Sequence, residues 1–209
     1  MDSTSVNTRL QVQYETVMTG NSEGLNAKPS NWPNNPNRPV EKVSWDDAQV
    51  FLTRLNAQQA GNLPAGWSYV LPTESQWEYA CRAGTTTAYS WGITIASSNA
   101  NYNWDGAHNT GNDFKQTRDV GQYAANPWGF FDMHGNVWEW TADWYQAAYP
   151  SGNPVVDPTG PASGGSYRVR RGGAWSYGGA HLRSAERGNG NPGARNADLG
   201  FRVGFQKSQ

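Results

Sequence analysis

The sequence GFFDMHGNVWEWTADWY, residues 129–145, is the stretch on which the fold of this chain depends. Two of its tryptophans, Trp138 and Trp140, alternate so that they share one face of an expected strand, and Glu139 points to the other face. Burying a carboxylate among large apolar side chains is costly, so backbone N–H groups, an arginine or a cation are expected beside Glu139. The stretch indicates either a core strand with one hydrogen-bonded acid or a site for Ca²⁺.

The chain has 209 residues, enough for one sizeable domain that buries about 70% of its unfolded surface. Its formal net charge of −1 offers no basic field for nucleic acid. No run of residues is apolar enough to span a membrane, and the first residues lack the apolar core of a signal peptide. We therefore expect one monomeric domain over residues 1–209. Localisation stays open, because a removed signal or anchor would place the protein at the cell surface or outside the cell.

The composition favours a fold rich in loops and held together by aromatic side chains. The chain contains 11 Trp, 10 Tyr and 24 Gly, so large rigid side chains supply the core while glycine lets irregular backbone turn around them. The only cysteine, Cys81, excludes an internal disulfide and a cysteine-rich zinc site. We expect it to be a packed, inert thiol.

Cap residues and apolar spacing place the first elements. Ser44 and Thr73 are typical N-caps, and Gln76 completes a capping box with Thr73. The expected elements are a weak helix over 10–18, an ordered loop over 19–39, a helix over 45–56, a strand over 67–71, and a helix that begins after Thr73 and stops before Gly84.

Five ordered motifs carry a resemblance to a known family. They are PVEKVSWDDA (39–48), LPTESQWEYACRAGT (71–85), GNVWEW (135–140), RGGAW (171–175) and LGFRV (199–203). In this order they resemble the formylglycine-generating enzyme, or sulfatase-modifying factor, family across nearly the whole chain. The resemblance implies an α+β variant of the C-type lectin fold, with a small twisted antiparallel sheet, two main helices and many irregular loops.

The resemblance also implies two structural calcium sites. The segment from 100 to 118 is rich in Asn, Asp and Gly, and oxygen donors on irregular backbone suit Ca²⁺, although any solvated loop has this composition. By similarity to the family, the first site would take Asn101, Tyr102 and Asp113, with a carbonyl from Phe114 or Lys115. The second would take Asn136, Val137 and Glu139.

The enzymes of this family that oxidise a substrate cysteine resemble one another in a pair of cysteines that binds copper(I), a metal that prefers soft thiolate ligands. Aligned backward from LGFRV, the two positions fall at Gly179 and Ser184, and neither residue binds copper. We therefore expect no copper and no catalysis. The alternative is a formylglycine-generating-type oxidoreductase, or another family enzyme, that acts on a thiol substrate.

Residues 171–203 combine two interleaved classes of residue. Trp175, Leu182, Arg183 and Arg195 are typical of a scaffold and are expected to point inward or brace loops. Each residue of the other class is Asn or can be reached from an Asn codon by changing adenines alone. This pattern resembles the variable proteins of diversity-generating retroelements, whose C-terminal repeat is mutated at adenines. Its members are Ser176, Tyr177, Gly178, Gly179, His181, Gly188, Asn189, Gly190, Asn191, Gly193, Ala194, Asn196, Ala197 and Asp198, and Glu186 joins them although its codon does not fit.

This arrangement favours a non-catalytic display protein that binds a protein or surface ligand. Small polar residues on a rigid frame give adaptable hydrogen bonding, and Tyr177 is the expected aromatic anchor. The null interpretation is that loops rich in glycine and asparagine look like this in any protein. The two interpretations differ in what they predict: only display requires the interchangeable residues to share one exposed face.

Overall fold

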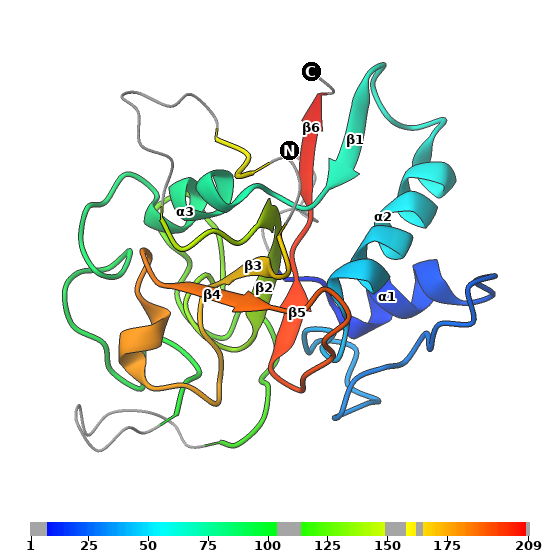
Figure 1. Ribbon diagram of the computed structural model, residues 1–209. Helices are drawn as coiled ribbons and strands as arrows, with labels where there is room; N and C mark the ends of the chain where they lie inside the picture. The colour runs from blue at the N-terminus through cyan, green and yellow to red at the C-terminus, as the bar shows by residue number, and fades with distance from the viewer. Residues whose placement is uncertain (1–7, 104–113, 149–157, 162–164, 208–209) are drawn as a thin grey trace.

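The computed structural model describes residues 8–103, 114–148, 158–161 and 165–207, and it has an α+β architecture (Figure 1). In chain order the elements are α1 (Gln11–Met18), α2 (Trp45–Gln59), β1 (Trp67–Val70), α3 (Glu74–Arg82), β2 (Trp138–Trp144), β3 (Arg168–Arg171), the 3₁₀ helix η2 (Gly179–Leu182), β4 (Arg187–Gly190), β5 (Leu199–Phe201) and β6 (Gly204–Lys207). No helix within these ranges is long and apolar enough to cross a membrane.

The helix starts are set by local chemistry, as the sequence predicts. The Ser44 side chain accepts from Asp47 N at 3.0 Å, and the Asp47 carboxylate accepts in return from Ser44 N. Thr73 and Gln76 form the same reciprocal pair at the start of α3. Both capping boxes satisfy backbone N–H groups that have no partner inside the helix. The second helix runs three residues beyond the predicted end at residue 56.

Two small sheets hold the strands together. The larger has the order β4-β3-β2-β5, and the smaller pairs β1 with β6. The predicted antiparallel sheet is wrong in one respect, because β5 lies parallel to β2, with Trp138 opposite Leu199 and Trp140 opposite Phe201. The reason is the crossing from β4 at one edge to β5 at the other, a loop over 191–198 that no hairpin turn could replace.

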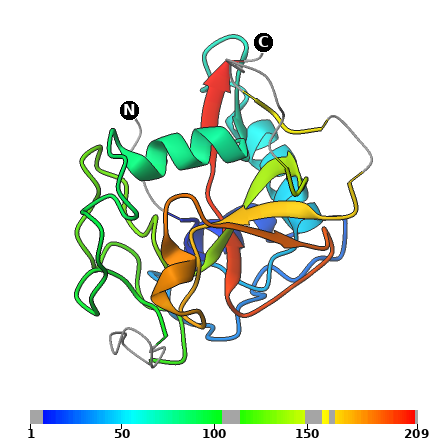
Figure 2. The same ribbon diagram turned by 60° about the vertical axis from the view of Figure 1, so that its left-hand side comes forward.

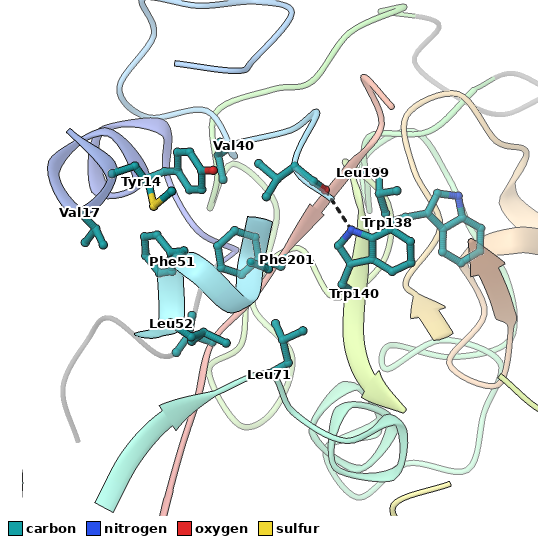
Figure 3. Close-up of a cluster of buried hydrophobic side chains, with 14 of the residues drawn as sticks. Tyr14, Val17, Val40, Phe51, Leu52, Leu71, Trp138, Trp140, Leu199 and Phe201 are labelled. Atoms are coloured by element: carbon teal, nitrogen blue, oxygen red, sulfur yellow. Dashed lines mark hydrogen bonds between the residues drawn. The ribbon is translucent and has the colours of Figure 1, made fainter. Parts of the chain in front are cut away.

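The main core lies between the first two helices and the centre of this sheet (Figure 3). Phe51 lies between Tyr14 and Phe201, with ring centroids 5.5 Å and 5.2 Å apart. Trp140 is fully buried, and its indole N–H donates to Val43 O at 3.0 Å. An aromatic core anchored by such a hydrogen bond gives the loops a rigid base.

Glu139 is the buried acid that the sequence indicates, and an arginine satisfies it. Only 1% of its surface is exposed. Arg202 donates to both carboxylate oxygens, at 2.7 Å and 2.9 Å. The indole of Trp77 and the hydroxyl of Thr8 each donate at 2.7 Å. This arrangement joins β2, α3 and the first and last described segments around one charge.

A second buried carboxylate, Glu41, escaped the sequence analysis. One of its oxygens accepts from Asn31 N at 2.6 Å, and the other has no hydrogen-bond partner among the described residues. The pKa of Glu41 is raised to about 7, mainly by burial and to a smaller extent by the nearby Asp198. The backbone N–H groups of Asn31 and Trp32 and the charge of Lys42 oppose this rise. Folding therefore makes the carboxyl group hold its proton more tightly.

We expect Glu41 to make stability fall as pH rises. A raised carboxyl pKa contributes stability that is fully present below the ordinary pKa of 4.5 and is lost as pH rises through about 7. Between pH 5 and pH 8 the native protein should lose on the order of 2 kcal/mol relative to Glu41→Gln. Denaturant unfolding of both proteins at both pH values measures this difference. Equal pH dependence in the two proteins would contradict the assignment.

Candidate ligand-binding surface

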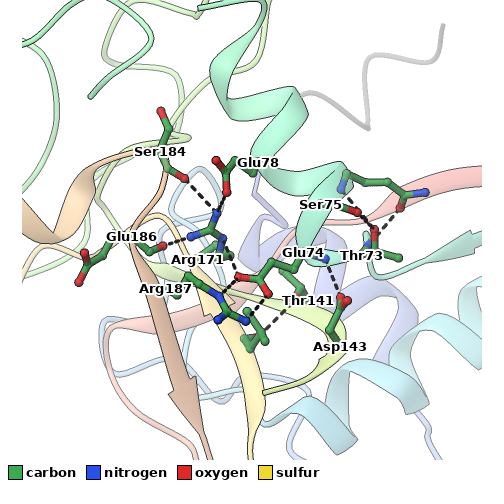
Figure 4. A network of polar contacts seen from close by, with 12 residues as sticks. Thr73, Glu74, Ser75, Glu78, Thr141, Asp143, Arg171, Ser184, Glu186 and Arg187 are labelled. Atoms are coloured by element: carbon green, nitrogen blue, oxygen red, sulfur yellow. Dashed lines mark hydrogen bonds and ion pairs between the residues drawn. The ribbon is translucent and has the colours of Figure 1, made fainter. Parts of the chain in front are cut away.

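A network of charged side chains fixes α3 to the strands below the candidate surface (Figure 4). Arg187 donates to both oxygens of Glu74, at 2.6 Å and 2.8 Å. Arg171 has no exposed surface and pairs with Glu78, while its guanidinium also donates to Ser184 O and Glu186 O. The sheet and the loop after η2 are thereby held in one position.

Asp143 extends the network below the start of α3. Its carboxylate accepts from Glu74 N at 2.6 Å. Burial is the main cause that raises the pKa of Asp143 to about 6, and the neighbouring Glu74 adds to it. The start of α3 therefore has a second acceptor for its free N–H groups.

The candidate residues follow η2, β4 and the crossing loop. In both views the orange segment that holds η2 and β4 lies at the surface beside β3 (Figure 2). The exposed members of the set are His181, Asn189, Asn191, Gly193 and Asn196. The partly exposed members are Ser176, Tyr177, Gly178, Glu186, Gly188, Gly190, Ala194, Ala197 and Asp198.

Direct contacts link several of these residues. The rings of Tyr177 and His181 lie 5.4 Å apart, and Glu186 accepts from His181 at 3.0 Å. The Ser176 hydroxyl donates to Asp198 at 2.6 Å, so residues 22 positions apart meet. Tyr177 also packs edge-on against the core ring of Trp138. The Tyr177 ring is therefore held by the buried Trp138 on one side and contacts the exposed His181 on another, as expected for an aromatic anchor.

Three glycines of the set cannot be freely exchanged, which corrects the prediction. Gly179 is buried, and a Cβ there would lie 2.7 Å from Ile95. A Cβ at Gly188 would meet Arg170 at 2.9 Å, and one at Gly190 would meet Trp140 at 2.7 Å. At these positions glycine is needed because neighbouring side chains, two of them from the sheet, fill the space.

Most of the expected scaffold residues brace the surface. Leu182 is fully buried, and the indole of Trp175 donates to Ala197 O at 3.1 Å. Arg195 makes two hydrogen bonds to Asp47, at 2.6 Å and 2.7 Å. Arg183 does not point inward: its side chain is 52% exposed, and it donates to Glu186 and to Ala180 O. It stabilises its own turn.

We expect Gly190→Ser to destabilise the fold and Gly193→Ser to leave it unchanged. The new side chain at residue 190 would press on the ring of Trp140 and cost about 1–3 kcal/mol. At Gly193 the nearest atom to an added Cβ lies 3.5 Å away, so the change should stay within about 0.5 kcal/mol. Urea unfolding of both variants checks this. Equal tolerance at the two positions would show that Trp140 yields to the new side chain.

The sequence analysis missed Arg170, which lies below Tyr177. Its NH2 group donates to the Tyr177 hydroxyl at 3.4 Å. The signal was present in RVRRGG, where Arg168 and Arg170 alternate and so share one strand face. Two arginines on one face of a short strand indicate a charged surface, but their partners cannot be read from spacing.

The first predicted calcium set is consistent with a cation as far as it is described. Asn101 is buried, and its side-chain oxygen has no hydrogen-bond partner among the described residues. Its amide nitrogen donates to Gln116 O and Asn136 Oδ1, which leaves the oxygen for another partner. Tyr102 is adjacent, and Asp113 lies outside the described residues. An unsatisfied buried oxygen is the kind of ligand that Ca²⁺ takes.

The second predicted calcium set does not fit a cation. Four donors, two of them on the guanidinium of Arg202, occupy both oxygens of Glu139. Asn136 Oδ1 accepts from Asn101 and from Arg118 N. Val137 is buried beside them. The calcium prediction therefore remains for the first set, Asn101 and Tyr102 with Asp113, and no group of three His, Cys, Asp or Glu side chains that could hold a metal gathers within the described ranges.

We expect calcium to raise the melting temperature through Asn101. A cation that binds only the folded state adds about 2.7 kcal/mol at 100 times its dissociation constant. Melting with excess CaCl₂ and with a chelator measures the shift, and Asn101→Ala should abolish the shift whatever it does to the baseline. MgCl₂ is the control. A shift that persists in Asn101→Ala would place the cation elsewhere.

The copper pair of the family has no counterpart at its predicted positions. Gly179 and Ser184 are both buried, and the Ser184 hydroxyl lies 3.7 Å from Cys81. The Cys81 thiol also lies 3.5 Å from His134. Burial raises the pKa of Cys81 to about 12 and lowers that of His134 to about 4. This thiol is kept protonated, which is the opposite of what a metal ligand or nucleophile needs.

An apolar hollow of about 730 Å³ lies between α3 and the smaller sheet. Trp67, Tyr69 and Phe205 form part of its wall, and among the described residues its one charged lining residue is Arg202. This arginine is already paired with Glu139.

A family model described as sulfatase-modifying factor enzyme 1-like domain matches residues 3–206. The formylglycine-generating enzyme of Streptomyces coelicolor is 37% identical over 179 residues, which cover 80% of this chain and 52% of that protein. The formylglycine-generating enzyme of Bos taurus is 33% identical over 177 residues, with 80% and 44% covered. The chain thus spans about half the length of the curated relatives it matches.

A solved structure gives a further likeness. Variable protein 1 of Treponema denticola superposes with a TM-score of 0.76 at 29% identity, covering 96% of this chain and 82% of that one. The resemblance predicted for residues 171–203 therefore agrees with a neighbour that is itself named a variable protein.

Proposed function

The chain belongs to the family of sulfatase-modifying factor enzyme 1-like domains, and on that premise we propose that it is a ligand-binding display protein that catalyses no oxidation. The alternation of braced and exposed residues along 175–198 carries this proposal. Leu182, Trp175 and Arg195 fix the backbone of this segment. Its exposed residues are polar or small, namely His181, Asn189, Asn191, Gly193 and Asn196.

The arrangement suits recognition because the frame and the contacts are separate. Exposed side chains that do not hold the backbone can be changed with little loss of folding stability, whereas the buried charged network keeps the backbone in place. The likeness to variable protein 1 supports the same function, since it extends over nearly the whole chain. We propose that the ligand is a protein or a surface component, that no nucleic acid is bound, and that calcium has a structural role at Asn101.

The test is a library at the exposed positions with matched buried controls. His181, Asn189, Asn191 and Asn196 are varied together, and Gly179 and Gly190 are varied in a second library. Most members of the first library should melt close to the native protein and yield binders to a chosen target such as lysozyme, whereas most of the second should unfold. Unfolding throughout the first library would contradict the display function.

The enzyme alternative is tested separately. A cysteine-containing peptide is incubated with the protein and copper(I), and aldehyde formation is measured. We expect none at any copper concentration, because no thiol stands at residues 179 and 184. Turnover that survives Cys81→Ser would reveal a catalytic centre that does not depend on this thiol.

A further inference from the structure

Arg170 lies beside Tyr177 of the candidate surface, and no carboxylate of the described residues pairs with its charge. Its guanidinium carbon lies 4.9 Å from the ring centroid of Trp138 and 6.0 Å from that of Tyr177. No carboxylate in the described part of the chain forms an ion pair with it, and its one hydrogen bond to those residues is the 3.4 Å contact to the Tyr177 hydroxyl. The residue is partly exposed, so the charge is within reach of a ligand.

The neighbouring arginines differ in this respect. Arg171, Arg187, Arg195 and Arg202 each pair with a carboxylate. Arg168, on the same strand face, lies between the rings of two tryptophans and donates to a backbone carbonyl at 2.8 Å. Arg168 is therefore held closely between two rings at 3.7 Å and 3.5 Å, whereas the rings beside Arg170 lie further away, at 4.9 Å and 6.0 Å.

The nearby acids are engaged elsewhere. Glu186 contacts His181 and Arg183, and Asp198 accepts from Ser176. The Nε group of Arg170 is buried without an acceptor among the described residues, which adds to the cost of leaving this cation alone. Among the described residues, the acids of the candidate surface, Glu186 and Asp198, therefore have partners other than Arg170.

Contact with aromatic rings is compatible with hydrogen bonding by the same guanidinium group. Aromatic rings contact the face of the group, whereas carboxylates bind its edge with two parallel hydrogen bonds. Gly188 on β4 pairs with Arg170 on the adjacent strand β3, and a Cβ at Gly188 would lie 3.0 Å from the Arg170 Nε. Glycine at this position therefore leaves room for the Arg170 side chain, which explains why one supposedly interchangeable residue is structurally required.

We propose that Arg170 is a fixed recognition point for a carboxylate of the bound ligand, an aspartate or glutamate side chain or the C-terminal carboxylate of a protein. This inference rests on the proposed display function. The residue belongs to β3 and not to the interchangeable set, so every variant of the surface retains it. The exposed residues around Tyr177 then determine which carboxylate-bearing ligand fits.

The experiment follows the Arg170 Nε–H signal by NMR in the ¹⁵N-labelled chain. The probes are N-acetyl-aspartic acid amide for a side-chain carboxylate, N-acetylglycine for a C-terminal carboxylate, and N-acetyl-asparagine amide as the neutral control. Either carboxylate should shift the signals of Arg170 and of the Tyr177 ring at millimolar concentration, and the neutral amide should not. The carboxylate that acts at the lower concentration identifies the source.

Variants make the result specific. R170Q should weaken the carboxylate-dependent shift at Tyr177 by about tenfold, R170K should weaken it less, and R168Q should leave it unchanged. Melting confirms that each variant is folded. Equal shifts with the neutral amide, or a Tyr177 shift that survives R170Q, would overturn the proposal. If the libraries display binders and the carboxylates do not bind, only this inference fails; if carboxylates bind and the first library unfolds, only the display function fails.

Discussion

Replacing Arg202 with methionine is expected to lower the free energy of unfolding by about 3–5 kcal/mol. The change removes two of the four donors to Glu139 and leaves a carboxylate that is 1% exposed without its countercharge. Methionine keeps most of the volume, so the loss reports the unpaired charge more than a cavity. Urea unfolding followed by tryptophan fluorescence measures it.

The double variant Arg202→Met with Glu139→Gln is the control. Removing both charges should restore part of the stability, because breaking a buried pair costs more than replacing it. A single variant within about 1 kcal/mol of the native protein would mean that another group, such as a cation, compensates Glu139. The experiment therefore also tests the rejection of the second calcium set.

Arg171→Met should be comparably severe, at about 3–5 kcal/mol. Its side chain has no exposed surface and contacts Glu78, Ser184 O and Glu186 O. The loss would leave these acceptors without their donor and would release the loop between η2 and β4. Thermal melting gives the size of the effect.

Arg183→Met is the matched control for Arg171→Met. Arg183 lies on the same loop and contacts Glu186, but its side chain is 52% exposed, so we expect a change within about 0.5 kcal/mol. Similar losses in the two variants would show that the buried network contributes no more than a surface ion pair.

The local features of the fold could be predicted from the sequence, and the distant ones could not. Ser44 and Thr73 were identified as caps because their partners lie three residues away. The Glu78–Arg82 pair, at 2.8 Å, is local in the same sense, because the two residues lie four apart on one helix. By contrast, nothing in the spacing points from Glu74 to Arg187, an arginine 113 residues away.

The same limit applies to the candidate surface. The codon pattern does not distinguish Gly190 from Gly193. It indicates which amino acids mutation at adenines can introduce, and not which of them the fold can accommodate. Only the position of the Trp140 ring separates them. Glu139 was predicted to need a partner, and its burial was foreseen, but Arg202 was one of several groups that would have satisfied it.

The parallel pairing of β5 with β2 has a consequence for how the protein is made. On the ribosome β5 and β6 emerge after every other described element, yet β5 completes the central sheet and Phe201 O accepts from Arg9 N. Until then the nascent chain exposes Trp138 and Trp140, whose burial needs Leu199 and Phe201. Such long-range contacts fold slowly. The central sheet is therefore completed only once β5 has emerged, and until then chaperones would have reason to cover the exposed aromatic side chains.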